Sequence, residues 1–398
     1  AMEIVYDDDG VRRVMRSMTT GALAREGGVT ADRPVLVDRF LEDAVEVDVD
    51  AVRDGAGEVL IGAVMEHVEE AGVHSGDSAC VIPPPTLTAA TVEVIEGYTR
   101  AIAEALDVRG PVNVQYAVKQ GQVFVIEANP RASRTLPFVA KATGVPLAKL
   151  AARVMVGATL AELRTEGLMG ATWTGAATPG PAGSGPGPGP GHVSVKEAVL
   201  PFNRFPDVDS VLGPEMRSTG EVMGIDRRFG LAFAKSQMAA GWRLPAGGSV
   251  FLSLADRDKA PGVEVAARFV DLGFTLVATA GTAAYMESHG VPVEAVVAKL
   301  GEGGKPGEGV PGDPGLGVVD LMAGGKITLV VNTPLGVGPR ADGGHIRTAA
   351  AFHRVPCLTT LAAARAAAAG MADWAEHPLA VHSLQEIHGT DHPRLPLT

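Results

Sequence analysis

A strictly alternating stretch, VEVDVDAV at residues 45–52, constrains the fold more than any other part of this chain. Valines alternate with Glu46, Asp48 and Asp50, so apolar and acidic side chains must lie on opposite faces of a strand. The pattern is typical of a half-buried antiparallel strand, with one face on the core and an acidic face opposite. Two further β-rich runs flank it, VLVDRFL at 35–41 and VLIGAVMEHV at 59–68, so strands follow one another closely here.

A helix and a hairpin follow this strand-rich region. Apolar residues at helical spacing predict a helix over about 87–106. The next stretch, residues 112–130 (VNVQYAVKQGQVFVIEANP), predicts two strands around a turn that contains Gly121. Another helix is expected after Gly144, with Pro146 in its first turn.

The second half of the chain has a different pattern. Residues 178–191 (TPGPAGSGPGPGPG) cannot bury a core and predict a flexible surface insertion. From about residue 245, apolar strands alternate with helices, which indicates a parallel sheet covered by helices and a domain boundary near 241–248. We therefore divide the chain into segments 1–140, 141–243 and 244–398.

Composition excludes several classes of function. A net charge of −12 and a pI near 5.3 lack the basic footprint of general nucleic-acid or anionic-membrane binding. The two cysteines, Cys80 and Cys357, form no disulfide framework or zinc spacing, which favours a reduced cytosolic compartment. The opening residues MEIVYD predict a strand, lack a signal-peptide pattern and include no methionine at position 1, so we expect the chain to begin inside a domain.

The hairpin carries the most informative group of polar residues. If its turn centres on Gly121, Gln115 lies opposite Glu127, and Asn129 shares that face. Such oxygen ligands, in partial number, suit a magnesium ion that also binds water and phosphate. Arg131 and Arg134, just beyond the strand, could hold phosphate oxygens. The alternative is an exposed strand face with solvated polar residues.

Long motifs in the chain resemble the second synthetase half of the carbamoyl-phosphate synthetase large subunit. They are VEVDVDAV, MEHVEEAGVHSGDSACVIPP, VNVQYAV, VIEANPRASRTLPFVAKATGVPLAKLAARVMVG, SVKEAVLPF and LGPEMRSTGEVMG. The resemblance implies α/β and α+β folds: the C-terminal portion of an ATP-grasp domain, then a parallel-sheet Rossmann-like domain similar to methylglyoxal synthase. A related ligase such as biotin carboxylase would share the Glu-x-Asn-x-Arg theme but not these longer motifs.

The resemblance also implies roles for residues in the synthetase portion. It makes Gln115, Glu127 and Asn129 ligands of Mg²⁺ or Mn²⁺, and Arg131 and Arg134 the arginines that bind phosphate and carbamate. The residues implied for the nucleotide are Arg39, Leu41, Glu46, Gly72, Val73, His74 and Ser75, together with Gln115 and Glu127. Without the resemblance, a solvated face is the favoured interpretation of Glu46, and a structural histidine is the favoured interpretation of His74.

Regulatory residues are implied in both halves. Glu69, Asp77 and Glu197 match positions where some family members bind the activator ornithine, although three acids are also ordinary surface. In the terminal domain, the residues that match an effector-phosphate site are Lys259, Thr279, Thr282, Lys299 and Asn332. A strand leading into a helix at Thr279 favours phosphate binding there, and simple helix capping is the alternative. Pro334 replaces a family threonine, which leaves the effector's identity open; uridine monophosphate serves many bacterial members.

The activity implied is ATP-dependent phosphorylation of carbamate to carbamoyl phosphate, for pyrimidine and arginine biosynthesis. A missing synthetase half would supply carbamate, and a glutamine amidotransferase small subunit would supply ammonia. The chain lacks the upstream glycine-rich loop of such enzymes, so we expect little activity from it alone. Two rivals stay open: a nucleotide-binding regulatory fragment without turnover, and a methylglyoxal synthase-like lyase, for which the closest acids are Asp320 and Asp342.

Overall fold

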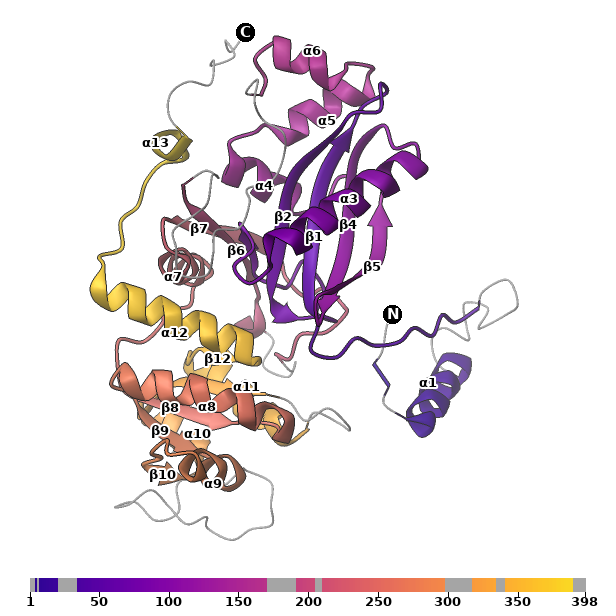
Figure 1. Ribbon diagram of the computed structural model, residues 1–398. Coiled ribbons are helices and arrows are strands. Elements are labelled where there is room, and N and C mark those ends of the chain that lie inside the picture. The colour runs from indigo at the N-terminus through magenta and orange to yellow at the C-terminus, as the bar shows by residue number, and fades with distance from the viewer. Residues whose placement is uncertain are drawn as a thin grey trace.

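A computed structural model describes residues 4–5, 7–20, 34–169, 191–204, 210–297, 317–333 and 341–388. The predicted Gly/Pro insertion lies almost entirely outside these residues. Within them, two sheets lie one above the other in Figure 1, and each is flanked by helices. No helix in the described ranges is long and apolar enough to cross a membrane.

The first sheet has seven antiparallel strands in the order β5-β4-β1-β2-β3-β6-β7. Their bounds are Val45–Arg53 (β1), Val59–Glu70 (β2), Cys80–Ile82 (β3), Gly110–Lys119 (β4), Gln122–Asn129 (β5), Val193–Val199 (β6) and Gly220–Asp226 (β7). The predicted hairpin is confirmed as β4 and β5. Strands β1 to β5 belong to segment 1–140, whereas β6 and β7 belong to segment 141–243. The two segments therefore share one sheet.

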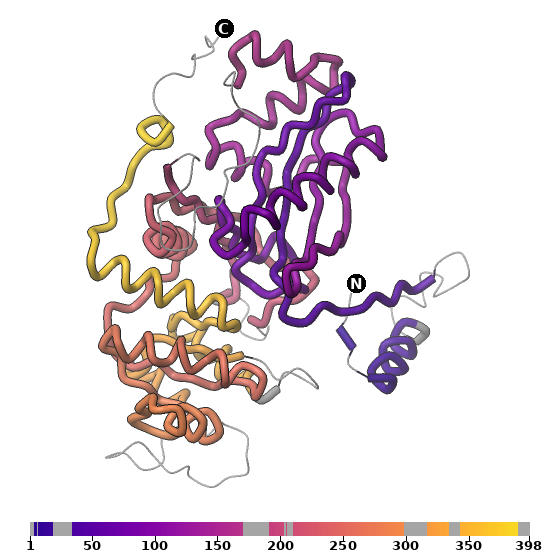
Figure 2. The backbone as a smooth tube through the Cα atoms, in the orientation of Figure 1, coloured from indigo at the N-terminus to yellow at the C-terminus, as the bar shows by residue number. Residues whose placement is uncertain are grey.

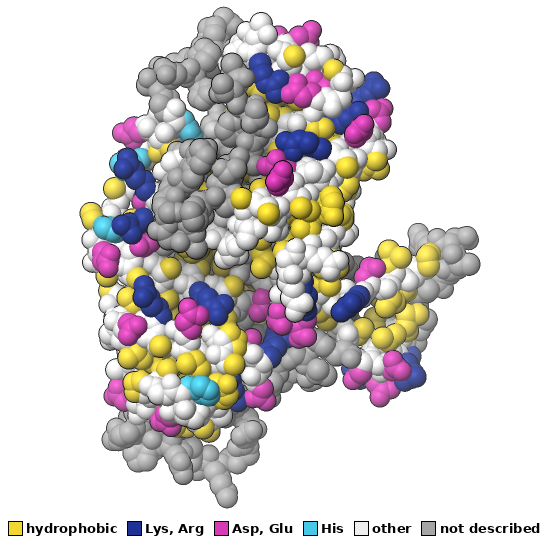
Figure 3. Space-filling model, viewed as in Figure 1, with side chains coloured by type: hydrophobic (Ala, Val, Ile, Leu, Met, Phe, Trp, Pro, Cys, Tyr) yellow, Lys and Arg dark blue, Asp and Glu magenta, His cyan; other side chains and the backbone are white. Residues whose placement is uncertain are grey.

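Helices cover both faces of this sheet. Helix α3 (Ala89–Ala105) crosses the front of the sheet in Figure 1, over the apolar side of β1. Helices α4 (Leu136–Thr143) and α5 (Leu147–Met155) pack on the other face, and α6 (Leu160–Thr165) follows them. The helices predicted after residues 87 and 144 are confirmed as α3 and α5. Exposed apolar side chains of α3 and β5 gather in the middle of the upper part of Figure 3.

The acidic face of β1 is not a solvent-facing surface, so the prediction of a half-buried strand is wrong. Glu46 is 9% exposed, and Asp48 and Asp50 are each 1% exposed. The strand lies in the interior of the sheet, between β2 and β4, and loops before β3 and α4 cover its acidic side. Alternation therefore separated apolar from polar residues correctly, but it did not separate buried from exposed ones.

Two predicted strands near the start of the chain do not form. Residues 34–41 are extended but unpaired, with Leu36 83% exposed. In the MEIVYD stretch, the structure describes Ile4, Val5 and Asp7, and none of them lies in a strand. Helix α1 (Asp8–Thr20) follows directly. A β-rich pattern makes a strand only when a partner strand is available, and the described residues provide none here.

The second sheet is parallel, with the order β10-β9-β8-β11-β12. Its strands are Ser249–Ser253 (β8), Thr275–Ala278 (β9), Ala295–Val296 (β10), Ile327–Asn332 (β11) and Cys357–Leu358 (β12). Its helices are Asp256–Asp271 (α8), Ala280–Ser288 (α9), Val318–Ala323 (α10), Ala341–His353 (α11) and Leu361–Glu376 (α12). The predicted alternation of strand and helix is confirmed, and the strand order reverses between β8 and β11.

Helices α7 (Phe229–Ala239) and α12 join the two sheets, as Figure 2 shows. They approach so closely that a Cβ added at Gly230 would overlap the backbone of Ala369. One hydrophobic cluster runs through the joint, from Val195 of the first sheet to Leu252 of the second. The short 3₁₀ helix Phe202–Arg204 precedes β7, and α13 (Leu384–His388) ends the described chain.

An ion pair also bridges the two parts. Arg257, in the first turn of α8, lies 2.8 Å from Glu42 Oε1 and 3.7 Å from Glu70 Oε2. Glu42 precedes β1 and Glu70 ends β2, so the beginning of α8 contacts the end of the sheet that also carries Glu46.

Candidate functional site

The polar residues of the first sheet form a grid on one face. Strand register places Asp48 opposite Gln115, and Gln115 opposite Glu127. The next row has Asp50, Asn113 and Asn129 directly opposite one another. Directly opposed residues of paired strands point to the same face, so the rows lie side by side. The predicted pairing of Gln115 with Glu127 is confirmed.

The three predicted metal ligands have the donor atoms that a hard cation needs. Asn129 Nδ2 donates to Glu127 Oε1 over 2.7 Å, and Gln115 Nε2 donates to Ser75 Oγ over 3.0 Å. Both amides thus turn their nitrogens to protein partners, which leaves their oxygens as potential ligands. No group of three or more His, Cys, Asp and Glu within the described ranges is arranged to hold a metal. A metal here would therefore depend on amide oxygens beside the Glu127 carboxylate.

The two predicted catalytic arginines lie in the loop between β5 and α4. Arg131 and Arg134 are both exposed. Arg131 Nη1 donates locally within this loop, to Ala132 O at 3.2 Å. The loop follows Asn129 directly, so it begins at the end of the strand that carries two of the predicted ligands.

The residues predicted for the nucleotide are partly brought together. Gly72 N donates to Glu46 Oε2 over 3.3 Å, so the 72–75 loop covers the acidic end of β1. Burial raises the pKa of Glu46. His74 accepts from Gly76 N at Nδ1 and therefore has a local structural bond. Val73 is half-buried in the same loop.

Arg39 and Leu41 lie in the unpaired segment before β1. Arg39 is exposed and Leu41 is half-buried. Their proximity to adenine stays a prediction.

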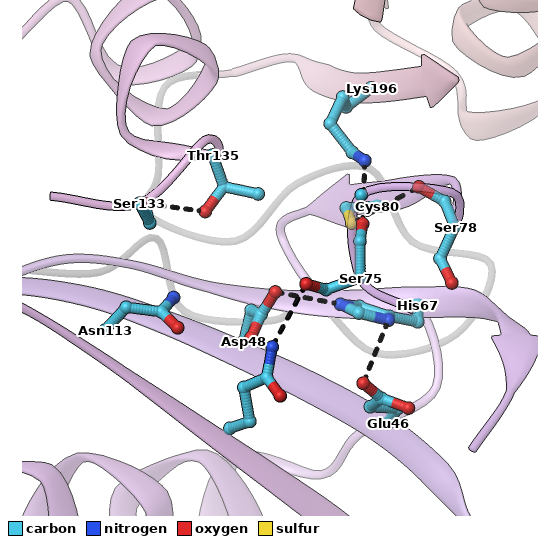
Figure 4. Close-up of polar contacts among 12 residues, drawn as sticks. Glu46, Asp48, His67, Ser75, Ser78, Cys80, Asn113, Ser133, Thr135 and Lys196 are labelled. Carbon is cyan, nitrogen blue, oxygen red and sulfur yellow. Dashed lines mark hydrogen bonds and ion pairs between the residues drawn. The ribbon is translucent and has the colours of Figure 1, made fainter. Parts of the chain in front are cut away.

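A buried histidine beside Glu46 escaped the sequence reasoning. His67 Nε2 lies 3.3 Å from Asp48 Oδ2, and its Nδ1 lies 3.8 Å from Glu46 Oε1 (Figure 4). Although burial lowers it, the pKa of His67 is raised overall by Cys80 and by the two carboxylates. Lys196 Nζ donates to Ser75 O over 3.1 Å in the same region. The acidic alternation of β1 was the available signal, because it placed Glu46 and Asp48 on one face.

Of the three predicted activator residues, two interact electrostatically. Burial and the neighbouring Glu69 raise the pKa of Glu197 to about 8. Gln237 of α7 donates to Glu197 Oε2 over 2.5 Å, and Ala79 N donates to Glu69 Oε2 over 2.6 Å. Asp77 instead accepts two backbone bonds, from the N–H groups of residues 217 and 218. The half-buried Glu69 and the buried Glu197 thus form an acidic pair, while Asp77 organises a loop.

The raised pKa of Glu197 predicts how stability depends on pH. An unfolded glutamate has a pKa near 4.5, so between about pH 4.5 and 8 the folded protein binds this proton more tightly. Stability contributed by protonated Glu197 is therefore lost as pH rises through that window. We expect Glu197→Gln to weaken the fall in melting temperature between about pH 5.5 and 8.5, measured by calorimetry. The exposed Glu104→Gln is the control, and an unchanged slope in Glu197→Gln would contradict the prediction.

The predicted effector residues gather at the carboxyl ends of β8, β9 and β11. Thr282 Oγ1 accepts from Leu254 N and from Thr279 Oγ1, each over 3.1 Å. Lys259 Nζ would lie 3.2 Å from a Cβ at Gly281, over the start of α9. Thr279 is the N-cap residue of α9 but makes no side-chain cap bond, so helix capping does not account for its hydroxyl.

Other members of this group are buried or outside the description. Asn332 Oδ1 accepts from the buried Arg347 over 2.7 Å at the end of β11. Lys299 and Pro334 lie outside the described residues. Asp256 Oδ1 lies 2.6 Å from Lys259 Nζ, so an acid that the sequence reasoning overlooked is beside the candidate phosphate site.

Comparison with known proteins connects both sheets to one family. Residues 1–163 match the family model of the carbamoyl-phosphate synthase L chain ATP binding domain, and residues 262–359 match the MGS-like domain. The carbamoyl phosphate synthase large chain of Mycobacterium bovis is 50% identical over 393 residues, covering 97% of this chain and 33% of that protein. The large chain of Rubrobacter xylanophilus is 50% identical over 388 residues, with the same coverage.

A solved structure gives a weaker likeness. The biotin carboxylase domain of the Hydrogenobacter thermophilus 2-oxoglutarate carboxylase aligns at a TM-score of 0.44 and 13% identity, over 60% of this chain and 52% of that one. The family matches and the sequence identity carry the assignment. This chain, about a third as long as the relatives it matches, is part of a carbamoyl phosphate synthase large chain and contains its ATP-binding domain and its MGS-like domain.

Proposed function

We propose that this part of the large chain uses Mg-ATP to phosphorylate carbamate, which gives carbamoyl phosphate and ADP. The observation that carries the proposal is the row of Gln115 and Glu127, with Asn129 beside it and two arginines in the next loop. This combines cation ligands with phosphate-binding groups, in a chain half identical to carbamoyl phosphate synthase large chains.

The residues of this chain would act by position and charge. Gln115, Glu127 and Asn129 would hold Mg²⁺ or Mn²⁺, which when bound offsets charge on the phosphates. Arg131 and Arg134 bind oxygens of the transferring phosphoryl group and of carbamate, and so align donor and acceptor. Glu46 accepts hydrogen bonds from the ribose hydroxyls. The transfer goes directly from ATP to carbamate oxygen and uses no protein nucleophile.

The complete reaction needs parts beyond this chain. Carbamate comes from another synthetase half and ammonia from a glutamine amidotransferase small subunit, in the cytoplasm, for pyrimidine and arginine biosynthesis. The chain spans about a third of its relatives, which supports low activity when it is alone. The same fact favours the rival proposal, a nucleotide-binding regulatory fragment without turnover.

Reversal of the reaction tests the proposal. Mg-ADP and carbamoyl phosphate are supplied to this chain and to the full-length large chain of which it is part, and ATP is measured. We expect ATP from the full-length protein and little from the chain alone. If the full-length protein makes no ATP, the proposed function is wrong. Nucleotide binding without any ATP formation would instead identify the regulatory fragment.

We also propose that the acids Glu69, Asp77 and Glu197 bind the ammonium-bearing activator ornithine. A further proposal is that the MGS-like domain binds a phosphate-bearing effector at Lys259, Thr279, Thr282, Lys299 and Asn332. The effector site is supported by the strand order of this sheet, which reverses between β8 and β11, because ligands of open α/β sheets bind at such a reversal. The contact of Arg257 with Glu42 links α8 to the first sheet.

Lys259→Gln tests the phosphate site. Loss of one charge-assisted bond should weaken binding of uridine monophosphate or inorganic phosphate about tenfold or more, measured by calorimetric titration. Lys326→Gln is the matched control, because Lys326 precedes the amino end of β11, whereas the candidate site lies at the carboxyl ends of the strands. Equal affinity in Lys259→Gln and the wild type would remove this lysine from the site.

The lyase remains a second candidate because Asp256 lies beside Lys259. It predicts that the chain forms methylglyoxal, with a rate that Asp256→Asn abolishes. A chain that forms none, under conditions in which it binds phosphate, contradicts this candidate.

A further inference from the structure

Asp50 is a buried carboxylate to which neither the sequence reasoning nor the proposed reaction gives a role. It is 1% exposed and lies in the row of Asn113 and Asn129. Its Oδ1 accepts from Asn113 Nδ2 over 3.0 Å, and its Oδ2 accepts from Thr135 Oγ1 over 2.7 Å. Both oxygens are thus engaged, one toward the strands and one toward the loop before α4.

The second bond connects Asp50 to the arginine loop. Thr135 is the N-cap residue of α4, yet its side chain makes no cap bond and turns to Asp50 instead. Ser133 Oγ accepts from Leu136 N over 2.9 Å and lies 3.0 Å from Thr135 Oγ1, as Figure 4 shows for the two hydroxyls. The chain of bonds therefore runs from the middle of β1 to the first turn of α4.

The loop has few other anchors among the described residues. Between Asn129 and Thr135 it has no regular structure, and its backbone bond from Arg131 N to Asn129 O is local. Arg131 and Arg134 are exposed, so packing does not hold their side chains. Asp50 bonds to Thr135 at one end of the loop. It also bonds to Asn113, which lies directly opposite Asn129 at the other end of the loop.

Burial of this carboxylate has a cost that its environment only partly offsets. Burial raises the pKa of Asp50 to about 6, against hydrogen bonds from Ser133, Thr135 and Asn113 that lower it. An apolar residue of similar size would avoid that cost, so stability alone gives a poor account of the acid. Active sites, in contrast, need supporting hydrogen bonds that lock the groups which touch substrate.

We propose that Asp50 is a positioning residue, which holds the loop of Arg131 and Arg134 against the ligand row so that both guanidiniums meet the transferring phosphoryl group. The proposal rests on the proposed function of that site. Asp50 does not touch substrate; it acts through Thr135 and Asn113. The nucleotide's ribose and adenine lie elsewhere, toward Glu46, so loss of Asp50 affects phosphoryl transfer and spares nucleotide binding.

The test compares Asp50→Ala and Thr135→Val with Thr135→Ser and Thr99→Val. Thr135→Ser keeps the hydroxyl and should rescue. Thr99 is a matched control, since this buried threonine of α3 bonds Tyr116 over 2.7 Å on the other face of the sheet. Thr99→Val therefore removes a buried hydroxyl bond without touching the loop.

Kinetics of ATP formation in the full-length large chain give the first readout. In Asp50→Ala and Thr135→Val, we expect kcat to fall about 100-fold, as for a displaced aligning group. We expect the KM for carbamoyl phosphate to rise about tenfold and the Kd of Mg-ADP to stay within about twofold. Wild-type kinetics in Thr135→Val, or a Kd of Mg-ADP that rises in parallel, would overturn the proposal.

Hydrogen exchange of this chain gives a readout that does not depend on activity. Amides of residues 131–136 should exchange at least about tenfold faster in Asp50→Ala and Thr135→Val, but not in Thr135→Ser or Thr99→Val. Unchanged exchange in this loop overturns the anchor. If the wild-type enzyme makes no ATP, the proposed function fails, and exchange alone then decides whether Asp50 holds the loop.

Discussion

Glu127→Gln in the full-length large chain should reduce ATP formation from Mg-ADP and carbamoyl phosphate about 100- to 1,000-fold. The substitution keeps the size of the side chain and an oxygen for the bond from Asn129 Nδ2, but removes the negative charge. Charge stabilisation by a bound metal contributes several kcal/mol to a transition state, and each 1.36 kcal/mol is a tenfold change in rate. The concentration of Mg²⁺ needed for half-maximal rate should rise, because an amide is a weaker ligand than a carboxylate.

Two measurements separate this result from a loss of folding. Glu127 is exposed, so the melting temperature of Glu127→Gln should stay close to that of the wild type. Glu93→Gln is the matched control, because Glu93 is an exposed glutamate of α3, away from the ligand row. Its rate and its Mg²⁺ dependence should match the wild type. A Glu127→Gln enzyme that keeps its rate at all Mg²⁺ concentrations would show that the metal, if bound, has other ligands.

Much of this site was predictable because strand periodicity is a strong local rule. The period of two placed Glu127 and Asn129 on one face, and a turn at Gly121 fixed Gln115 opposite Glu127. The register observed between β4 and β5 agrees, and so does the strand–helix alternation of the second sheet. These features depend on residues close together in the sequence.

The missed features depend on contacts between distant segments. The burial of Asp48 is decided by β2 and by the loop that follows it. The contact of His67 with Asp48 could be identified only from the pairing of β1 with β2. The bond of Asp50 to Thr135 spans 85 positions. The run at 35–41 shows the converse, because its β-rich pattern finds no partner strand among the described residues. Periodicity fixes faces, whereas tertiary contacts fix burial and partners.

The tightest contact of β7 gives the largest expected change in stability. Gly224 lies in this strand under α7, and a Cβ at this position would overlap the backbone of Ala232 and lie 2.5 Å from Ser236 N. Backbone atoms of a helix interior cannot move aside as a side chain can. Gly224→Ala must therefore lift α7 from the sheet, and the cost of such overpacking is about 3 kcal/mol. The melting temperature should fall by roughly 6 to 12 °C, measured by calorimetry.

Gly220→Ala is a stringent control for this effect. Gly220 begins the same strand, and a Cβ there would meet nothing within 4 Å, so the same substitution should leave the melting temperature within about 2 °C of the wild type. Because α7 also contacts α12 at Gly230, lifting it should loosen the joint between the two sheets. Proteolysis between the sheets should then accelerate in Gly224→Ala. Equal melting temperatures for the two variants would contradict the close contact between Gly224 of β7 and the backbone of α7.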